Sequence, residues 1–206
     1  ATHPHVDHIQ GMKEVLAECP AAVVLSGQHC FKSSDLPGAS VIEVKGSNRL
    51  WLDEGTELWT WSPDIALDSA TAISSAGNDI SVLSRVKMGK ISFLFTGDAG
   101  PAEFAMLDET NSEVASTVVK VPHHGSKYCW YDPFWDKQHS EYAVVSVGAR
   151  NTFGHPNPMV LKRLGDSGIV VLRTDLDGAI TFLTDGQEMQ VQTMSSEISK
   201  NGVSTN

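Results

Sequence analysis

The sequence predicts a single α/β domain, and two observations carry this prediction. The 206 residues are 41% hydrophobic, which is enough to fill one core of ordinary size. Short apolar runs suited to strands alternate along the chain with segments at helical spacing, and such alternation is typical of α/β domains. Neither an internal repeat nor a linker interrupts the pattern, so a second domain is not expected.

The first half of the chain is expected to begin with a helix and to continue mainly with strands. Apolar residues recur at helical spacing over residues 9–18, and Pro20 then ends the helix. Trp59 and Trp61 alternate along one strand, which indicates packing on a sheet face rather than a ligand platform. The strands expected here cover residues 21–26, 40–44, 57–61, 80–87 and 91–96.

Helices and strands alternate more evenly in the second half. Pro101 suits the first turn of a helix, where its missing N–H is not needed. Residues 195–206 lack periodicity and are expected to form a flexible tail after a domain of residues 1–194. The other elements expected are helices at residues 132–137 and 158–164 and strands at residues 117–121, 142–147, 169–173, 179–183 and 189–193.

The overall composition restricts the classes of partner and compartment. The formal net charge is −10, from 25 acidic and 15 basic residues. Proteins that grip long nucleic acid usually show a basic face, so tight non-specific DNA binding is not expected, whereas a cation site is. The longest apolar runs fall well short of the roughly 20 residues that cross a bilayer. The odd set Cys19, Cys30 and Cys129, without CxxC spacing, favours reduced thiols in a cytoplasmic setting.

The chain opens with a cluster of potential metal ligands, THPHVDH at residues 2–8. Imidazole and carboxylate groups bind divalent metals without thiol chemistry. His3 and His5 are two residues apart, so in an extended segment they point the same way and can share one ion. Asp7 and His8 follow at the turn into the helix, where a second ion could be held beside the first. The alternative is a chance histidine cluster.

Three further motifs each follow an expected strand. FTGDAG delivers Asp98, whose carboxylate either bridges two ions or caps the helix that starts at Pro101. VPHHGSK contains the adjacent His123 and His124, whose side chains diverge, so one is expected to bind metal and the other to orient or contact substrate. GHPNP places His155 in a loop rich in glycine and proline.

Taken together, HxHxDH, TGD, PHHGS, GHPNP and RTDLDGA resemble the metallo-β-lactamase superfamily. Within it, they resemble the metallo-β-lactamase-like domain of ComEC-type competence proteins and their stand-alone relatives, from Thr2 to about Thr193. The resemblance implies a four-layer αββα sandwich. Superfamily members carry strands before HxHxDH, so the opening strands are expected to be missing here. A partner chain or a preceding segment would then cover the exposed sheet edges.

The resemblance also implies a role for each residue of the cluster. His3 and His5 would hold the first metal, and Asp7 and His8 the second. Asp98 would bridge the two ions. His123, or else His124, would complete the second site.

One position departs from the superfamily pattern in a way that bears on the metal. Many members have another histidine roughly twenty residues before the GD motif, whereas this chain has Asn78 followed by Asp79 and Ser81. ComEC-like sequences likewise tend to show asparagine and serine here. Asn78, Asp79 or water would supply oxygen, which makes manganese as well as zinc a candidate, because oxygen ligands suit harder ions.

The implied activity is that of a dinuclear metal-dependent hydrolase, in which a metal-activated water attacks phosphorus or a carbonyl. Asp7 and Asp98 would orient the water, and His155 would stabilise charge on the non-bridging oxygens. For Ser126 and Lys127, helix capping and surface charge are the alternative roles. The candidate substrate contacts are His124, Ser126, Lys127 and Asn78.

Three functions follow from this reading. The ComEC-like branch favours a phosphodiesterase, as in a nuclease acting on DNA. The first alternative is a hydrolase of a small ester, lactone or phosphodiester, because one fold hosts many chemistries. The second is a non-catalytic, metal-bound module that regulates or scaffolds a larger assembly.

Overall fold

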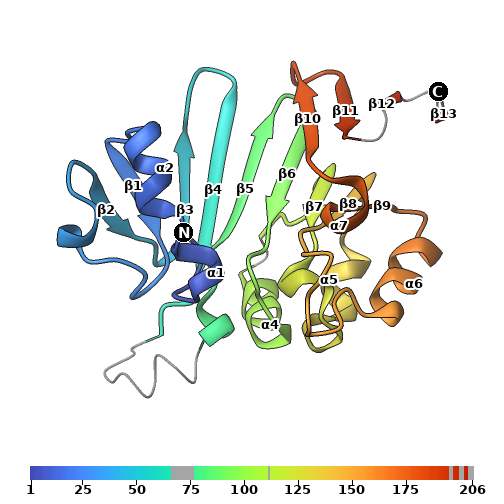
Figure 1. Cartoon of the computed structure of the whole chain (residues 1–206), viewed down its shortest axis with the longest axis horizontal. Coiled ribbons are helices and arrows are strands. Elements are labelled where there is room, and N and C mark those ends of the chain that lie inside the picture. Colours follow the sequence, from blue (N-terminus) through green and yellow to red (C-terminus); the bar gives the residue numbers. More distant parts are fainter. Residues whose placement is uncertain (66–76, 111, 195–196, 200–201, 204–206) are drawn as a thin grey trace.

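A large mixed sheet forms the centre of the molecule (Figure 1). The computed structural model describes residues 1–65, 77–110, 112–194, 197–199 and 202–203. Within these ranges the central sheet has seven strands, which follow one another in chain order from β3 to β9. They are β3 (Gly46–Trp51), β4 (Thr56–Ser62), β5 (Leu83–Met88), β6 (Ile91–Phe95), β7 (Val118–Lys120), β8 (Tyr142–Val145) and β9 (Val170–Arg173).

The pairing within this sheet changes direction at β6. Strands β3 to β6 pair antiparallel, and β6 to β9 pair parallel. Two smaller sheets accompany it: β1 (Val23–Ser26) pairs in parallel with β2 (Ser40–Glu43). An antiparallel sheet is made of β10 (Ile180–Thr184), β11 (Met189–Thr193), β12 (Glu197–Ser199) and β13 (Gly202–Val203).

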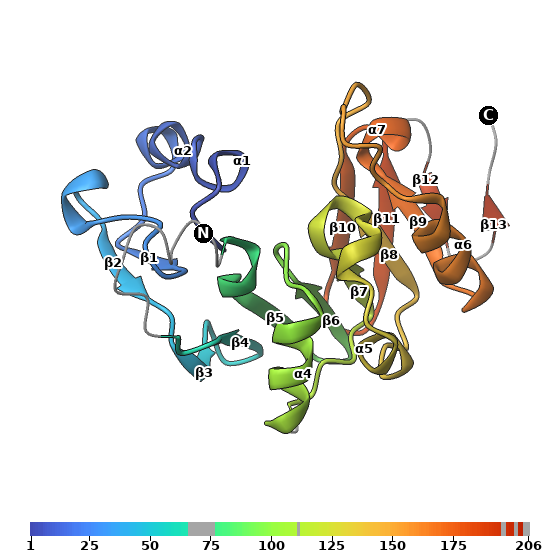
Figure 2. The same cartoon turned by 90° about the horizontal axis from the view of Figure 1, so that it is seen from below.

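Helices cover the central sheet. Figure 2 shows α4 and α5 on one side of it, with α1 and α2 on the other. Over the described ranges, no helix has the length and apolar character needed to cross a membrane. The α-helices are α1 (Val6–Ile9), α2 (Met12–Glu18), α4 (Pro101–Glu109), α5 (Asp132–Asp136), α6 (Pro158–Asp166) and α7 (Thr174–Asp177). The 3₁₀-helices are η1 (Ser33–Asp35), η2 (Gly77–Ile80), η3 (Pro122–Gly125) and η4 (Lys127–Cys129).

Two apolar clusters join these layers. The larger one packs side chains of α4, α5 and α6 against the sheet, and Trp59 and Trp61 are buried in it, as the alternation along that strand predicts. The smaller one joins the other face of the sheet to β11, where Val191 and Met189 meet Val118 of β7. The prediction of an α/β domain is therefore confirmed.

Several elements differ from the expectation. The helix expected over residues 9–18 is divided into α1 and α2, with Gly11 as the N-cap of α2, because glycine is a poor residue for a helix interior. The strand expected over 80–87 begins at Leu83. Strand β3 was not expected, since its side chains are mostly exposed and polar and show no alternation. Helix α7 was missed because four residues give no period.

The carboxyl end and the cysteines test two further expectations. Strands β12 and β13 lie in the segment expected to be a flexible tail, where two or three residues are too few to show a period of two. Residues 195–196, 200–201 and 204–206 lie outside the described residues. All three cysteines are described, and each is free: Cys19 is exposed, and Cys30 and Cys129 are buried.

The contact between α4 and α5 gives a test of the core. Phe104 is 0% exposed, and its ring stacks on Phe134 with centroids 4.1 Å apart. We expect Phe104→Ala to lower the free energy of unfolding by about 3–5 kcal/mol, because it removes buried surface and leaves a cavity. Urea denaturation measures this. Met106→Ala on the exposed face of α4 is the control and should change it by less than about 1 kcal/mol; equal effects would contradict the packing described.

Candidate metal centre

The carboxyl ends of the parallel strands bring the sequence motifs together. Asp98 lies in the turn after β6, the two histidines of η3 follow β7, and the loop that carries His155 follows β8. Ligand sites in open α/β sheets form at this end of parallel strands. The amino-terminal segment lies beside these loops and adds the histidines of the HxHxDH motif.

Backbone hydrogen bonds fix the amino-terminal segment in place. Ala1 N donates to the Leu25 carbonyl at 3.0 Å, and Val82 N donates to the Thr2 carbonyl at 3.0 Å. At Gly27, a Cβ would lie 2.1 Å from that Thr2 oxygen, so only glycine fits there. The first histidine is therefore held between the end of β1 and the start of β5.

Asp98 lies at the middle of the cluster. Its side chain is almost fully buried, and the Nε2 atoms of four histidines lie 3.4 to 3.9 Å from its oxygens: His3, His8, His123 and His124. The Lys120 ammonium group lies 3.9 Å away. Burial alone would raise the pKa of Asp98, but His8, Lys120 and His124 outweigh burial and hold the pKa below its ordinary value. Asp98 is thus a carboxylate in a cationic or metal-binding environment.

Asp98 does not cap the helix that follows it, which was the alternative role. The N-cap of α4 is Gly100, and the Gly100 N–H donates to the Glu103 carboxylate at 2.9 Å. This leaves both Asp98 oxygens turned toward the histidines.

Two groups of ligand atoms in the described residues could hold an ion. His3, His8 and Asp98 form one group, and Asp7, His8 and His124 form the other, each with its atoms within 4.8 Å of one another. Among the described residues, His8 Nε2 and Asp98 Oδ1 are buried without a hydrogen-bond partner, although they lie only 3.4 Å apart. Buried polar atoms are normally paired, so a divalent cation between them fits this donor set.

The geometry separates the roles of the two adjacent histidines. His124 Nδ1 lies 2.7 Å from the Ser146 carbonyl, which can only accept, so Nδ1 carries a proton. Nε2 faces Asp7 and Asp98, and in the neutral ring its lone pair is free to bind a metal. His123 Nδ1 instead lies 3.1 Å from the Asn78 amide and 3.2 Å from the Cys129 thiol. Of the two, His124 is the one within a ligand group; the ligand role of His123 stays a prediction.

The remaining predicted ligands lie at the edge of the cluster. His5 is exposed, and its Nδ1 lies 3.0 Å from His3 Nε2. The two side chains therefore point to the same place, as their spacing predicts, and their sharing of one ion stays a prediction. Asp7 is largely exposed at the rim. The His155 ring lies 5.7 Å from the His123 ring, and burial lowers the pKa of His155.

Ser126 and Lys127 do not face the cluster as substrate contacts would. Ser126 is buried, and its Oγ accepts the Tyr128 N–H at 3.4 Å as the cap of η4. The Lys127 ammonium group lies over the Tyr128 ring, 5.0 Å from its centroid. The alternative roles, capping and surface charge, describe these two side chains better.

Three residues support the cluster without having stood out in the sequence. The Thr2 hydroxyl lies 3.1 Å from Nδ1 of both His3 and His8, which orients two ligands at once. Lys120 donates to the Gly97 carbonyl at 2.9 Å and so braces the turn before Asp98. Glu103 braces the same turn through Gly100. A lysine within the apolar run TVVKV was the available signal for Lys120.

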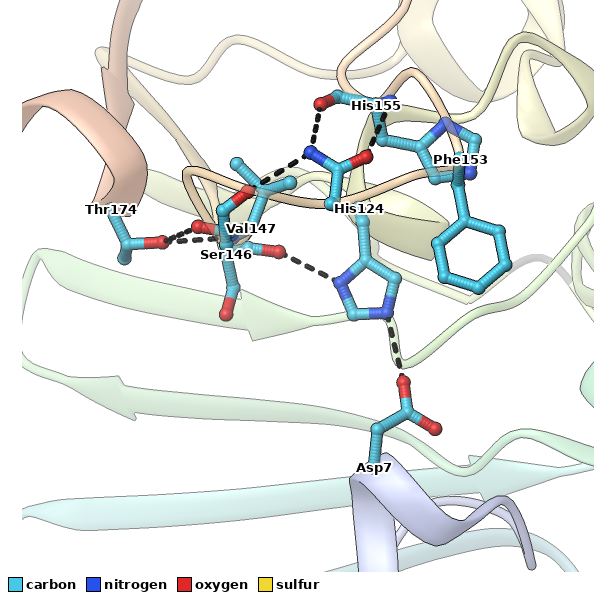
Figure 3. A pocket seen from close by; sticks show the side chains of 9 residues that line it. Asp7, His124, Ser146, Val147, Phe153, His155 and Thr174 are labelled. Carbon is cyan, nitrogen blue, oxygen red and sulfur yellow. Dashed lines mark hydrogen bonds and ion pairs between the residues drawn. The ribbon is translucent and has the colours of Figure 1, made fainter.

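A pocket of about 340 Å³ opens beside the cluster (Figure 3). Asp7 and His124 line the pocket on the side of the cluster, and Phe153 and His155 line it from the loop after β8. Thr174 of α7 accepts the Val147 N–H and donates to the Val147 carbonyl, each at 2.8 Å. These bonds fix the loop next to the Ser146 carbonyl that orients His124.

The amino-acid sequence is similar to those of competence proteins. The chain is 36% identical to Competence protein ComA of Neisseria gonorrhoeae over 106 residues. This match covers 51% of this chain and 15% of ComA. ComE operon protein 3 of Bacillus subtilis (strain 168) is 28% identical over 191 residues, 88% of this chain and 24% of that protein.

A third relative matches over nearly the whole chain. Uncharacterized protein YcaI of Escherichia coli (strain K12) is 29% identical over 201 residues, 96% of this chain and 24% of YcaI. The chain thus spans a quarter or less of the length of each of these relatives. No protein-family model matches it.

The buried carboxyl of Glu103 gives a test by pH. Burial raises its pKa well above the ordinary value of 4.5, so the folded protein holds this proton more tightly than the unfolded chain. The free energy of unfolding should therefore fall as the pH rises above that value. Glu103→Gln keeps an acceptor for Gly100 and removes the titration, so its stability should fall less than wild type between about pH 5 and about pH 8.

Urea denaturation at constant ionic strength measures both slopes. Glu109→Gln, at the exposed end of the same helix, is the matched control and should follow the wild type. Identical pH slopes for wild type and Glu103→Gln would contradict the buried, proton-holding carboxyl.

Proposed function

We propose that this chain is a dinuclear metal-dependent hydrolase of the metallo-β-lactamase superfamily that cleaves phosphodiester bonds in DNA. The observation that carries the proposal is the pair of ligand groups that share His8 around the buried Asp98. Buried histidine and carboxylate atoms are rarely gathered without hydrogen-bond partners unless they bind an ion. The motifs also follow successive strands in the order that the superfamily resemblance implies.

The fold and the relatives support the same proposal. A mixed sheet with helices on its faces is compatible with the αββα sandwich of the superfamily. Two relatives carry competence in their names, and competence is the capacity of cells to take up DNA, which favours a nucleic-acid substrate. The cytoplasmic setting remains a prediction.

Bound divalent ions, zinc or manganese, would supply the Lewis acidity that activates water and polarises a phosphoryl oxygen. His3, Asp7, His8, Asp98 and His124 would hold these ions, and the Nε2 atom of His8, which has a single lone pair, would bind one of them. Asn78 stands in place of a superfamily histidine, and its amide contacts His123. Oxygen donors at this position would suit a harder ion than histidine does, so manganese is a candidate as well as zinc.

The chain's own groups around the cluster suit hydrolysis of a phosphodiester. Asp7 is exposed at the rim, where it can orient water and accept its proton. His155 lines the pocket, from where its imidazole can donate to a non-bridging oxygen. Lys120 lies behind Asp98, with its ammonium nitrogen 3.9 Å from the carboxylate; burial lowers the pKa of this group, and Asp98 opposes that effect.

A small phosphodiester, ester or lactone is the second candidate substrate class. The net charge of −10 opposes a long polyanion, and the pocket of about 340 Å³ is of small-molecule size. Added salt distinguishes the two classes, since it weakens binding of a long nucleic acid strongly and of a small ester hardly at all.

Replacement of the central carboxylate tests the metal assignment. We expect wild type purified without chelator to carry about two zinc or manganese ions. Asp98→Asn should lose at least one ion, because the amide removes the charge between the ligand groups, and hydrolysis of a nitrophenyl phosphodiester should fall by about 100-fold or more. Elemental analysis and absorbance measure the two effects. Asp108→Asn, which removes a surface partner of Lys137, is the control; unchanged metal content in Asp98→Asn would refute the assignment.

Replacement of His155 separates catalysis from metal binding. In His155→Ala we expect kcat for the same phosphodiester to fall about 10- to 1,000-fold, because a donor to the transition state is lost. Metal content should stay at the wild-type level, since the side chain belongs to neither ligand group. His139→Ala, an exposed histidine after α5, is the control. Full activity of His155→Ala would remove this residue from the mechanism.

A further inference from the structure

The loop after β8 presents an aromatic ring to solvent beside the candidate metal centre. Phe153 is 81% exposed, although burying a phenylalanine would contribute about 1.5–3 kcal/mol. Single exposed apolar residues are common on protein surfaces, so exposure by itself indicates nothing. The position of the ring is the relevant observation, because it lines the same pocket as Asp7 and His124.

Hydrogen bonds brace the loop that carries Phe153. The Asn151 side chain donates to the carbonyls of Gly148 and His155 at 3.0 and 2.8 Å and accepts the His155 N–H at 3.1 Å. Asn157 N donates to the Gly125 carbonyl at 2.9 Å, which ties the loop to η3. Phe153 is therefore exposed on a loop whose backbone is fixed by hydrogen bonds.

The ring is also aligned with its neighbour. Its plane lies 15° from that of His155, with centroids 6.1 Å apart, in the range of offset stacking. Figure 3 shows Phe153 beside His155 and His124, with Asp7 across the pocket. A flat group seated against Phe153 would thus lie next to the groups proposed to act on a phosphodiester.

The charge of the protein favours such a contact for a nucleotide substrate. Proteins that bind nucleic acid mainly through phosphates need many lysines and arginines, and this chain has a net charge of −10. Stacking of a base on an aromatic side chain contributes about 1–3 kcal/mol and tolerates any sequence, because every base has a π face.

We propose that Phe153 is a substrate-positioning residue that stacks on the nucleobase next to the scissile phosphodiester, in the pocket between the loop after β8 and the metal centre. This inference rests on the proposed function and extends it from a phosphodiester to a base-bearing nucleotide. Phe153 acts by holding the substrate, so its contribution belongs in KM rather than in kcat.

The test compares two single-stranded oligonucleotides of equal length, a thymidylate and one in which tetrahydrofuran replaces every base-bearing sugar. The metal-loaded wild type should hydrolyse the thymidylate about 5- to 150-fold more efficiently in kcat/KM. Phe153→Leu keeps the apolar volume and loses the ring, so this preference should disappear through a higher KM for the thymidylate alone. Phe153→Trp should retain it. Trp51→Leu, at an exposed aromatic on β3, is the control and should behave as wild type.

Two outcomes would overturn the inference while leaving the hydrolase intact. One is equal hydrolysis of both oligonucleotides by wild type. The other is an equal loss on both substrates in Phe153→Leu, which would indicate a structural role of the ring. Fluorescence anisotropy with the same labelled oligonucleotides gives a reading independent of turnover. If wild type cleaves neither, the proposed hydrolysis fails, and equal affinity for the two would overturn the stacking separately.

Discussion

A nearly fully buried carboxylate organises the functional end of this molecule. An unpaired buried charge is costly, and Asp98 remains ionised only because histidines and Lys120 surround it. Those partners come from the amino-terminal segment and the strand β7 with the turn η3 that follows it. Loss of the negative charge would leave these groups without their common partner, so the packing of the surrounding loops depends on it.

The backbone around this carboxylate adopts conformations that most residues avoid. His123 and His124 have φ values of 45° and 54°, in the left-handed region that costs a non-glycine residue roughly 1–2 kcal/mol. At Gly125, with φ of 82°, a Cβ would meet the Pro156 side chain at 2.7 Å. Strain of this kind persists only where the surroundings impose it. Here it turns both imidazoles toward one carboxylate, although adjacent side chains normally diverge.

Much of this arrangement could be predicted from the sequence, because the motifs are local and their residue types are chemically distinctive. The α/β class and the gathering of the histidines and aspartates at strand ends followed from spacing and from the resemblance. Which ring nitrogen of a histidine faces the cluster did not follow. For His124 it is set by the Ser146 carbonyl, a backbone atom that every residue type offers alike. Ser126 was placed in the site because of its neighbours, and its capping of η4 shows only in three dimensions.

The parallel half of the central sheet has a consequence for the order of folding. Parallel strands need long crossover connections, and contacts between distant segments form slowly because loop closure is entropically costly. The hydrogen bond between Ser81 and His3 joins residues 78 positions apart in the sequence. His124 likewise has its hydrogen-bond partner, the Ser146 carbonyl, after β8. The histidines of the HxHxDH motif are thus made before their partners and stay without them until β6, β7 and β8 have paired. An ion that arrives before this pairing therefore meets only part of the group of ligand atoms.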